Sequence, residues 1–124
     1  MNWSVKKKAK SYYEKSAEKK FPKAYNSLGK FYHYGYGGVE KSFVESMKYY
    51  TKAADSGDIY AIMNCGLTCM EEYSKAPTKS DLLDEAEKYF LKAASYNNAE
   101  GLFQLGNVYE IRTKQDKSFL NKAK

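Results

Sequence analysis

Two cysteines and the single histidine are the side chains of this sequence best suited to metal or nucleophilic chemistry. Cys65 and Cys69 are four residues apart, which places them on one face of a helix. A structural zinc site needs four ligands, and His33 supplies only one of the two that are missing. The spacing therefore favours buried free thiols, because an intact helix holds such a pair too far apart for a disulfide. A small metal-binding protein or enzyme built on Cys65, Cys69 and His33 is the alternative hypothesis.

The glycine run at Gly35, Gly37 and Gly38 resembles a phosphate-binding loop only in composition. No Lys-Ser or Lys-Thr pair follows in register, and the run lies between two helical patterns rather than after a strand. His33 precedes the run without a second histidine or a nucleophile motif, which favours a solvent-facing or rim position. We therefore expect no catalytic residue, no cofactor and no enzymatic activity.

The positive charge of the chain is concentrated at its start. The net charge is +6, and residues 1–23 account for all of it with eight lysines and two glutamates. The lysines between Lys6 and Lys10 favour the solvated side of a terminal helix, with a contact to an acidic protein or membrane surface as the second interpretation. Binding to nucleic acid is not expected, since no known motif accompanies the charge.

Composition places the chain among single-domain globular proteins. Its 124 residues are 43% hydrophobic and include 13 tyrosines, which is enough for a core. No stretch approaches the about 18 apolar residues of a membrane span. The early lysines are not followed by the apolar run of a signal peptide. Two cysteines do not form a disulfide framework, so we expect a cytoplasmic location unless a leader was removed.

Residues 22–58 show two helical patterns around the glycine run. In the first pattern, Ala24, Leu28 and Tyr32 recur every four residues and share one face. The glycines then end this helix, because glycine tolerates the backbone angles of a turn. A second helix follows and is expected to end at Gly57. Its small and aromatic face consists of Ser46, Tyr49, Tyr50, Ala53 and Ala54.

This stretch resembles a Sel1-like repeat, which is related to the tetratricopeptide repeat. The positions that fit the family pattern are Ala24, Leu28, Gly29, Tyr32, Gly35, Gly37, Tyr50, Ala53, Ala54 and Gly57. The resemblance implies an all-α fold, a right-handed α-solenoid of antiparallel helix pairs. It also implies an adaptor or scaffold that binds other proteins, without naming a partner.

Further copies of the pattern divide the single domain 1–124. A second repeat spans residues 59–98, with Ala61, Cys65, Gly66 and Cys69 in the places of the first repeat's helix face. Its connecting loop, from Glu72 to Lys79, is longer and lacks glycine, and we expect Ser80 or Asp81 to cap the next helix.

Partial copies flank these two repeats. Residues 1–21 form a half repeat, whose helix is expected over residues 3–20. Its predicted packing face consists of Val5, Ala9, Tyr12, Tyr13, Ser16 and Ala17. Residues 99–124 form a partial repeat, in which a short loop should precede a second helix marked by Asp116 and Leu120. We expect apolar surface at both ends, and therefore self-association or docking onto more chain of a longer solenoid.

One glycine recurs in the middle of each first helix, at Gly29, Gly66 and Gly106. Glycine there costs about 1 kcal/mol relative to alanine, so we expect each to allow the close approach of a neighbouring helix.

The surface expected to bind a partner is the concave face, which the first helices line in related repeats. Its candidate residues, taken from positions off the packing face, are Asn26, Lys30, His33, Met63, Leu67, Met70, Phe103, Asn107 and Glu110. The middle repeat contributes three apolar side chains, which suit a peptide or a partner helix. The other interpretation is that a further helix or a neighbouring chain covers them.

Overall fold

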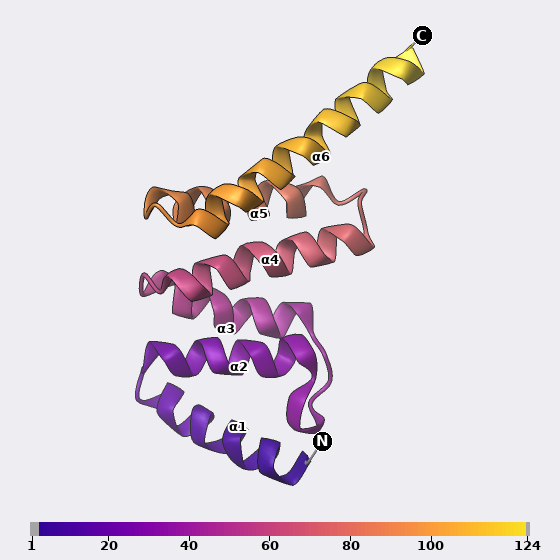
Figure 1. Ribbon diagram of the computed structural model, residues 1–124. Helices are drawn as coiled ribbons and strands as arrows, with labels where there is room; N and C mark the ends of the chain where they lie inside the picture. The colour runs from indigo at the N-terminus through magenta and orange to yellow at the C-terminus, as the bar shows by residue number, and fades with distance from the viewer. Residues whose placement is uncertain (1–2, 124) are drawn as a thin grey trace.

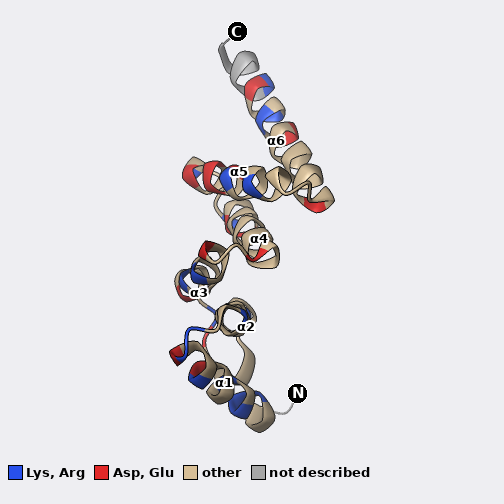
Figure 2. Ribbon diagram, turned by 90° about the vertical axis from the view of Figure 1, so that its left-hand side faces the viewer, with Lys and Arg blue, Asp and Glu red and all other residues tan. Residues whose placement is uncertain are grey.

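The computed structural model describes residues 3–123, with side chains for residues 3–117. The described elements are α1 (Trp3–Glu18), α2 (Pro22–Tyr34), the 3-10 turn η1 (Tyr36–Gly38), α3 (Phe43–Asp55), α4 (Ile59–Lys75), α5 (Ser80–Ser95) and α6 (Ala99–Ala123). Successive helices run in opposite directions and stack from α1 to α6 (Figure 1). Seen from the side, α2, α4 and α6 lie towards one edge of the stack, and α3 and α5 towards the other (Figure 2). The predicted all-α solenoid is confirmed.

The glycine turn between α2 and α3 has the predicted backbone. Gly35 ends α2 with a φ of 72° and donates its N–H to the carbonyl of Phe31, a conformation that glycine adopts without strain. Gly37 follows with a φ of 63° and is buried against the backbone of α1. Ser42 then caps α3 by accepting a hydrogen bond of 3.0 Å from the N–H of Glu45.

The connection between α4 and α5 is shorter than the sequence suggested. Helix α4 continues to Lys75, so only residues 76–79 connect the two helices, with Pro77 just beyond the end of α4. The predicted caps of α5 are wrong, because Lys79 holds the N-cap position and makes no side-chain cap bond. Asp58, by contrast, caps α4 by accepting from the N–H groups of Tyr60 and Ala61.

Helix α6 is one continuous helix, and the loop predicted before Asp116 is wrong. The sequence after Gly106 contains neither glycine nor proline, so no residue there interrupts the helix. Figure 1 shows α6 leaving the stack beyond its contact with α5. Leu120 was expected to mark the same second helix, but its side chain lies outside the described ones.

Two of the three recurring glycines allow the predicted close approach of helices. A Cβ atom added at Gly29 would lie 2.4 Å from the ring of Tyr50, and one at Gly66 would lie 2.5 Å from the ring of Phe90. Both rings are fully buried in the pair formed with the following helix. At Gly106 a Cβ atom would meet nothing within 4 Å among the described residues, so no helix approaches closely there in the described part of the chain.

Helix α1 packs on α2 and on the glycine turn. The hydroxyl of Tyr25 donates to the carbonyl of Ala17 at 3.1 Å, and the rings of Tyr13 and Phe31 meet edge to face. The predicted packing face of α1 is wrong for Val5 and Tyr12, which are 60% and 70% exposed. Among the described residues, the main contacts of α1 are with α2 and η1, which leaves part of its predicted packing face exposed.

None of the described helices is long and apolar enough to cross a membrane.

Candidate functional site

Polar side chains join α2 to α4 at two places, and a pocket lies at each. We call this boundary the α2–α4 seam. Near the start of both helices, the amide Nδ2 of Asn64 donates to Oδ1 of Asn26 at 2.9 Å. Near their other ends, Nε2 of His33 lies 2.7 Å from Oε2 of Glu71. The seam therefore joins two neighbouring repeats through side-chain hydrogen bonds.

The first pocket of the seam has a volume of about 440 Å³ and is open to solvent. It is lined by Lys23, Asn26, Ser27, Lys30, Asp58, Tyr60 and Asn64. Tyr60 is 78% exposed, so its ring is available as a contact surface. No ion pair to Lys23 or Lys30 occurs among the described residues, whereas the carboxylate of Asp58 is engaged at the N-terminus of α4.

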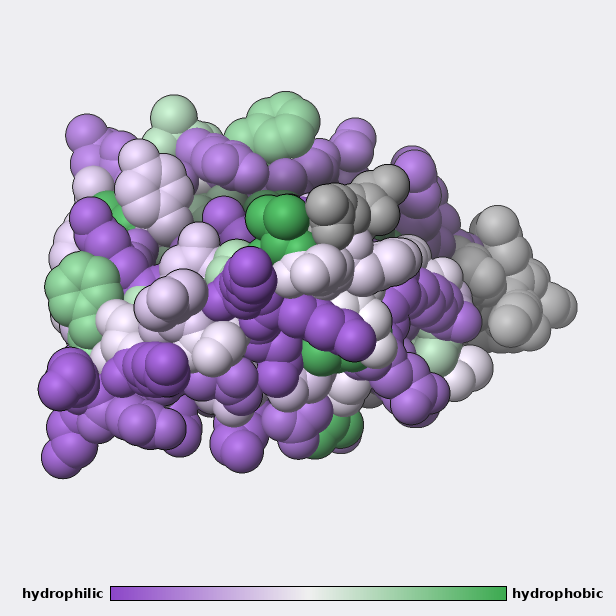
Figure 3. Space-filling view, turned by 90° about the horizontal axis from the view of Figure 1, so that it is seen from below, coloured by the Kyte–Doolittle hydropathy of each residue, from purple (hydrophilic) through white to green (hydrophobic). Residues whose placement is uncertain are grey.

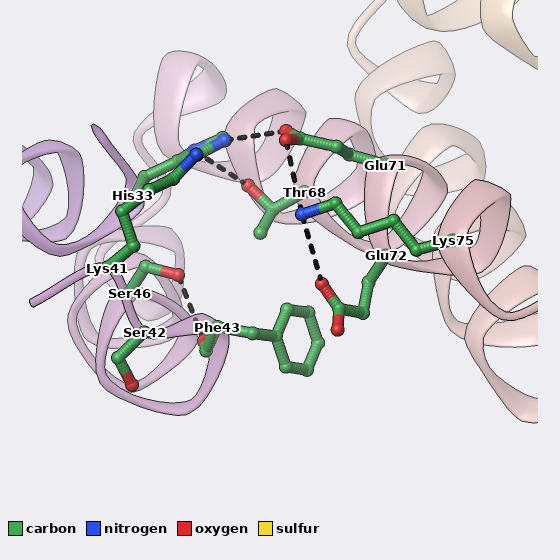
Figure 4. A pocket seen from close by; sticks show the side chains of 9 residues that line it. All are labelled: His33, Lys41, Ser42, Phe43, Ser46, Thr68, Glu71, Glu72 and Lys75. Atoms are coloured by element: carbon green, nitrogen blue, oxygen red, sulfur yellow. Dashed lines mark hydrogen bonds and ion pairs between the residues drawn. The ribbon is translucent and has the colours of Figure 1, made fainter. Parts of the chain in front are cut away.

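The second pocket, of about 210 Å³, surrounds His33 (Figure 4). Its lining consists of His33, Lys41, Ser42, Phe43, Ser46, Thr68, Glu71, Glu72 and Lys75. The hydrogen bond from His33 lowers the pKa of the Glu71 carboxyl, and nearby Lys75 acts in the same direction. The sequence placed His33 at a solvent-facing or rim position, but its side chain is only 15% exposed.

The polar groups around His33 hydrogen-bond to one another and to nearby backbone. Ser42 caps α3, and the hydroxyl of Ser46 donates to the carbonyl of Phe43 at 2.9 Å. Nδ1 of His33 lies 3.3 Å from the hydroxyl of Tyr50, whose pKa is raised by burial. Neither serine is hydrogen-bonded to the histidine. The hydroxyl of Thr68 lies 3.4 Å from Nδ1 of His33 and is only 4% exposed, so this hydroxyl–imidazole contact is buried beneath the pocket surface.

The two cysteines are free thiols, as predicted, and they face α5. Burial raises the pKa of Cys65 to about 12 and that of Cys69 to about 11, so both remain protonated at neutral pH. Among the described residues, no group of three or more His, Cys, Asp or Glu side chains could hold a metal ion. The described residues thus do not bring Cys65, Cys69 and His33 together as a ligand set, and His33 is hydrogen-bonded to Glu71.

The predicted concave-face residues fall into three different environments. Asn26, Lys30 and His33 line the pockets of the seam. Met63 is buried in the core, although the sequence placed it off the packing face, and Leu67 and Met70 pack against that core half-buried. The core cluster that contains Met63, and against which Leu67 and Met70 pack, also includes residues of α3, α5 and α6 such as Tyr50, Phe90 and Val108.

In α6 the corresponding positions lie largely open. Phe103 is 67% exposed, and Glu110 is also exposed. Asn107 is half-buried and donates to Oε1 of Gln104 at 3.2 Å. The structure therefore does not bring these three residues together with those of the α2–α4 seam.

Sequence reasoning missed the α4 side of both pockets, including Tyr60 and Asn64 in the first and Thr68 and Glu71 in the second. Asn64 and Glu71 are seven residues apart, which places them on the same helical face. They are polar positions in a helix whose neighbouring residues are largely apolar. The polar pair Asn64 and Glu71 could have indicated that this face of α4 is not part of the apolar core, because a fully buried face would be apolar.

Fold and site together define a helical-repeat protein built as a stack of antiparallel helix pairs. A family model described as Sel1 repeat matches residues 4–21, 22–58 and 59–97. The chain belongs to the Sel1 repeat family. Sel1 repeats are generally protein-interaction modules and typically non-catalytic scaffolds.

One solved structure gives the fold independently. The chain is similar to a Sel1 repeat protein from Oxalobacter formigenes, with 31% sequence identity and a TM-score of 0.67. The match covers 85% of this chain but only 41% of that one, so this chain spans less than half the length of its neighbour. A comparison with curated proteins found no match.

Proposed function

We propose that this chain is a non-catalytic scaffold that holds an extended peptide of a partner protein along the α2–α4 seam. The observation that carries the proposal is the pocket of about 440 Å³ around the Asn26–Asn64 pair. Its amide groups have hydrogen-bonding capacity beyond their mutual bond, and such groups match the donors and acceptors of a peptide backbone. Within the seam, the expected concave-face residues Asn26 and Lys30 are polar and line an open pocket.

Charge and shape favour an acidic, extended segment over an amphipathic helix. Lys23 and Lys30 flank the Asn pair, and Tyr60 offers an exposed ring beside them. A partner helix would need a continuous apolar groove. The apolar candidate at the centre of that groove, Met63, is buried instead. We also propose a cytoplasmic location, since buried free thiols suit a reducing compartment.

Selection from a phage-displayed library of linear peptides tests this function. The wild-type protein should enrich acidic sequences, and binding of an enriched peptide should weaken roughly tenfold in Lys30→Glu and in Asn64→Ala. Lys92→Glu is the matched control, because it makes the same charge change at an exposed position on α5. Absence of enrichment, or an equal loss in Lys92→Glu, would contradict the proposal.

A further inference from the structure

Helix α6 presents a first-helix face that its own chain leaves uncovered among the described residues. In the two complete repeats, the mid-helix glycine receives an aromatic ring from the following helix, Tyr50 at Gly29 and Phe90 at Gly66. The gap that each such glycine leaves in the helix surface is called its notch. At Gly106 no described atom lies within 4 Å of an added Cβ, so this notch is unfilled among the described residues. Leu102 and Tyr109, on either side of it, are each 52% exposed. These three residues lie at i, i+4 and i+7 and form one stripe, which we call the α6 stripe.

Helix α1 carries the matching face of a second helix. Its sequence Tyr12–Ala17 parallels residues 49–54 of α3, so Tyr13 stands in the place of Tyr50. Tyr50 is 1% exposed and Phe90 is 0% exposed, but Tyr13 is 38% exposed. The counterpart of the ring that packs against the glycine in both complete repeats is thus present on α1. There Tyr13 meets the edge of Phe31 and, among the described residues, has no glycine to pack against.

Tyr12, which precedes Tyr13 in α1, also corresponds to a tyrosine that packs on a first helix. In the first repeat, Tyr49 of α3 stacks on Tyr32 of α2, with ring centroids 5.7 Å apart and planes 11° apart. The counterpart of Tyr32 in α6 is Tyr109, and the counterpart of Tyr49 in α1 is Tyr12, which is 70% exposed. The hydroxyl of Tyr109 is held by Glu87 at 2.7 Å, so its exposed ring is oriented by α5.

Charge favours the meeting of these two faces. The first 23 residues carry a net charge of +6. The part of α6 from Ala99 to Ile111 contains Glu100 and Glu110 and no lysine or arginine. The surface at the α1 end shows apolar side chains set among hydrophilic ones (Figure 3). A basic aromatic face attracts an acidic aromatic face, whereas two basic faces or two acidic faces repel each other.

We infer that α1 of a second copy of this chain docks on the α6 stripe and completes the repeat that α6 begins. In this assembly, Tyr13 of the second copy enters the Gly106 notch, and its Tyr12 stacks on Tyr109. The contact joins two different surfaces, so it is heterologous and propagates head to tail. Repeat arrays extend by the same stacking of one unit on the next.

Sedimentation velocity of the full chain over a wide concentration range tests the assembly. The mean mass of the wild type should rise with concentration and fall with added salt. Gly106→Leu should weaken association roughly tenfold or more by filling the notch. Tyr12→Ser should have a similar effect and does not endanger the fold, since Tyr12 is largely exposed. Tyr60→Ala, which removes an exposed ring from the α2–α4 seam, is the control and should leave association unchanged.

Disulfide trapping distinguishes head-to-tail docking from a symmetric dimer. The Cβ position at Gly29 lies 3.0 Å from Cγ of Tyr50, so cysteines at the corresponding positions would be close enough to bridge. A mixture of Gly106→Cys and Tyr13→Cys chains should form a mixed disulfide that neither variant forms alone. A strictly monomeric wild type, association that both Gly106→Leu and Tyr12→Ser leave intact, or Tyr13→Cys chains that cross-link only to one another would each overturn the inference.

Discussion

Adding a single methyl group at Gly66 or at Gly106 should change stability in opposite directions. A Cβ atom at Gly66 would lie 2.5, 2.8 and 2.9 Å from three ring atoms of Phe90, well inside ordinary contact distance. Phe90 is 0% exposed, so its ring moves only if α4 and α5 separate. Overpacking of this kind costs roughly 1–3 kcal/mol, against a gain in helix propensity of about 1 kcal/mol for alanine over glycine.

We therefore expect Gly66→Ala to destabilise the protein slightly, and Gly66→Leu to destabilise it by about 2 kcal/mol or more, since leucine adds three further carbons. At Gly106 a Cβ atom meets nothing within 4 Å, so only the propensity term applies. Gly106→Ala should stabilise the protein by roughly 0.5–1 kcal/mol. Urea denaturation followed by circular dichroism, at a concentration too low for association, measures both series. Equal shifts of the two alanine midpoints would refute the packing argument.

Two further predictions concern titratable groups. The hydrogen bond from His33 lowers the folded-state pKa of Glu71 below its ordinary value, so its contribution is present at neutral pH and is lost as pH falls through the lowered pKa. Glu71→Gln should thus reduce the midpoint of urea denaturation at pH 7 but not at pH 3, and a loss independent of pH would exclude this pair as its cause. The raised pKa values and burial of Cys65 and Cys69 predict that a thiol reagent at pH 8 reacts with neither in the folded protein and with both in urea. Rapid labelling without denaturant would show that α4 and α5 open readily.

The helix pairs were predictable because their signals are local. Gly35 and Gly57 adopt positive φ, with values of 72° and 89°, where the sequence placed helix ends. The same local logic explains the failure at α6, since a predicted loop without glycine or proline has nothing to end the helix. The end of α4 was misplaced for a related reason. Residues 72–75 are ordinary helix formers, and only Pro77 marks a limit.

The site was less predictable because a helix face depends on what stacks against it. Asn26, Met63 and Phe103 occupy corresponding positions in the first helices of three repeats. Asn26 bonds to α4 beside a pocket, Met63 is 5% exposed, and Phe103 is 67% exposed. Periodicity within one helix gives the direction of a side chain relative to that helix. It does not give the angle at which the next repeat crosses, and that angle decides which residues are covered.

Peptide binding and assembly of copies take place on two different surfaces of the molecule. The α2–α4 seam lies between repeats that are both present, so its pockets exist in a single copy of the chain. The α6 stripe has no covering helix among the described residues, and its counterpart on α1 belongs to the opposite end of the stack. Peptide binding at the seam and assembly at the ends therefore use different residues. Gly106→Leu should weaken assembly while leaving peptide affinity unchanged. Lys30→Glu should weaken peptide binding while leaving assembly unchanged, because neither substitution touches the other surface.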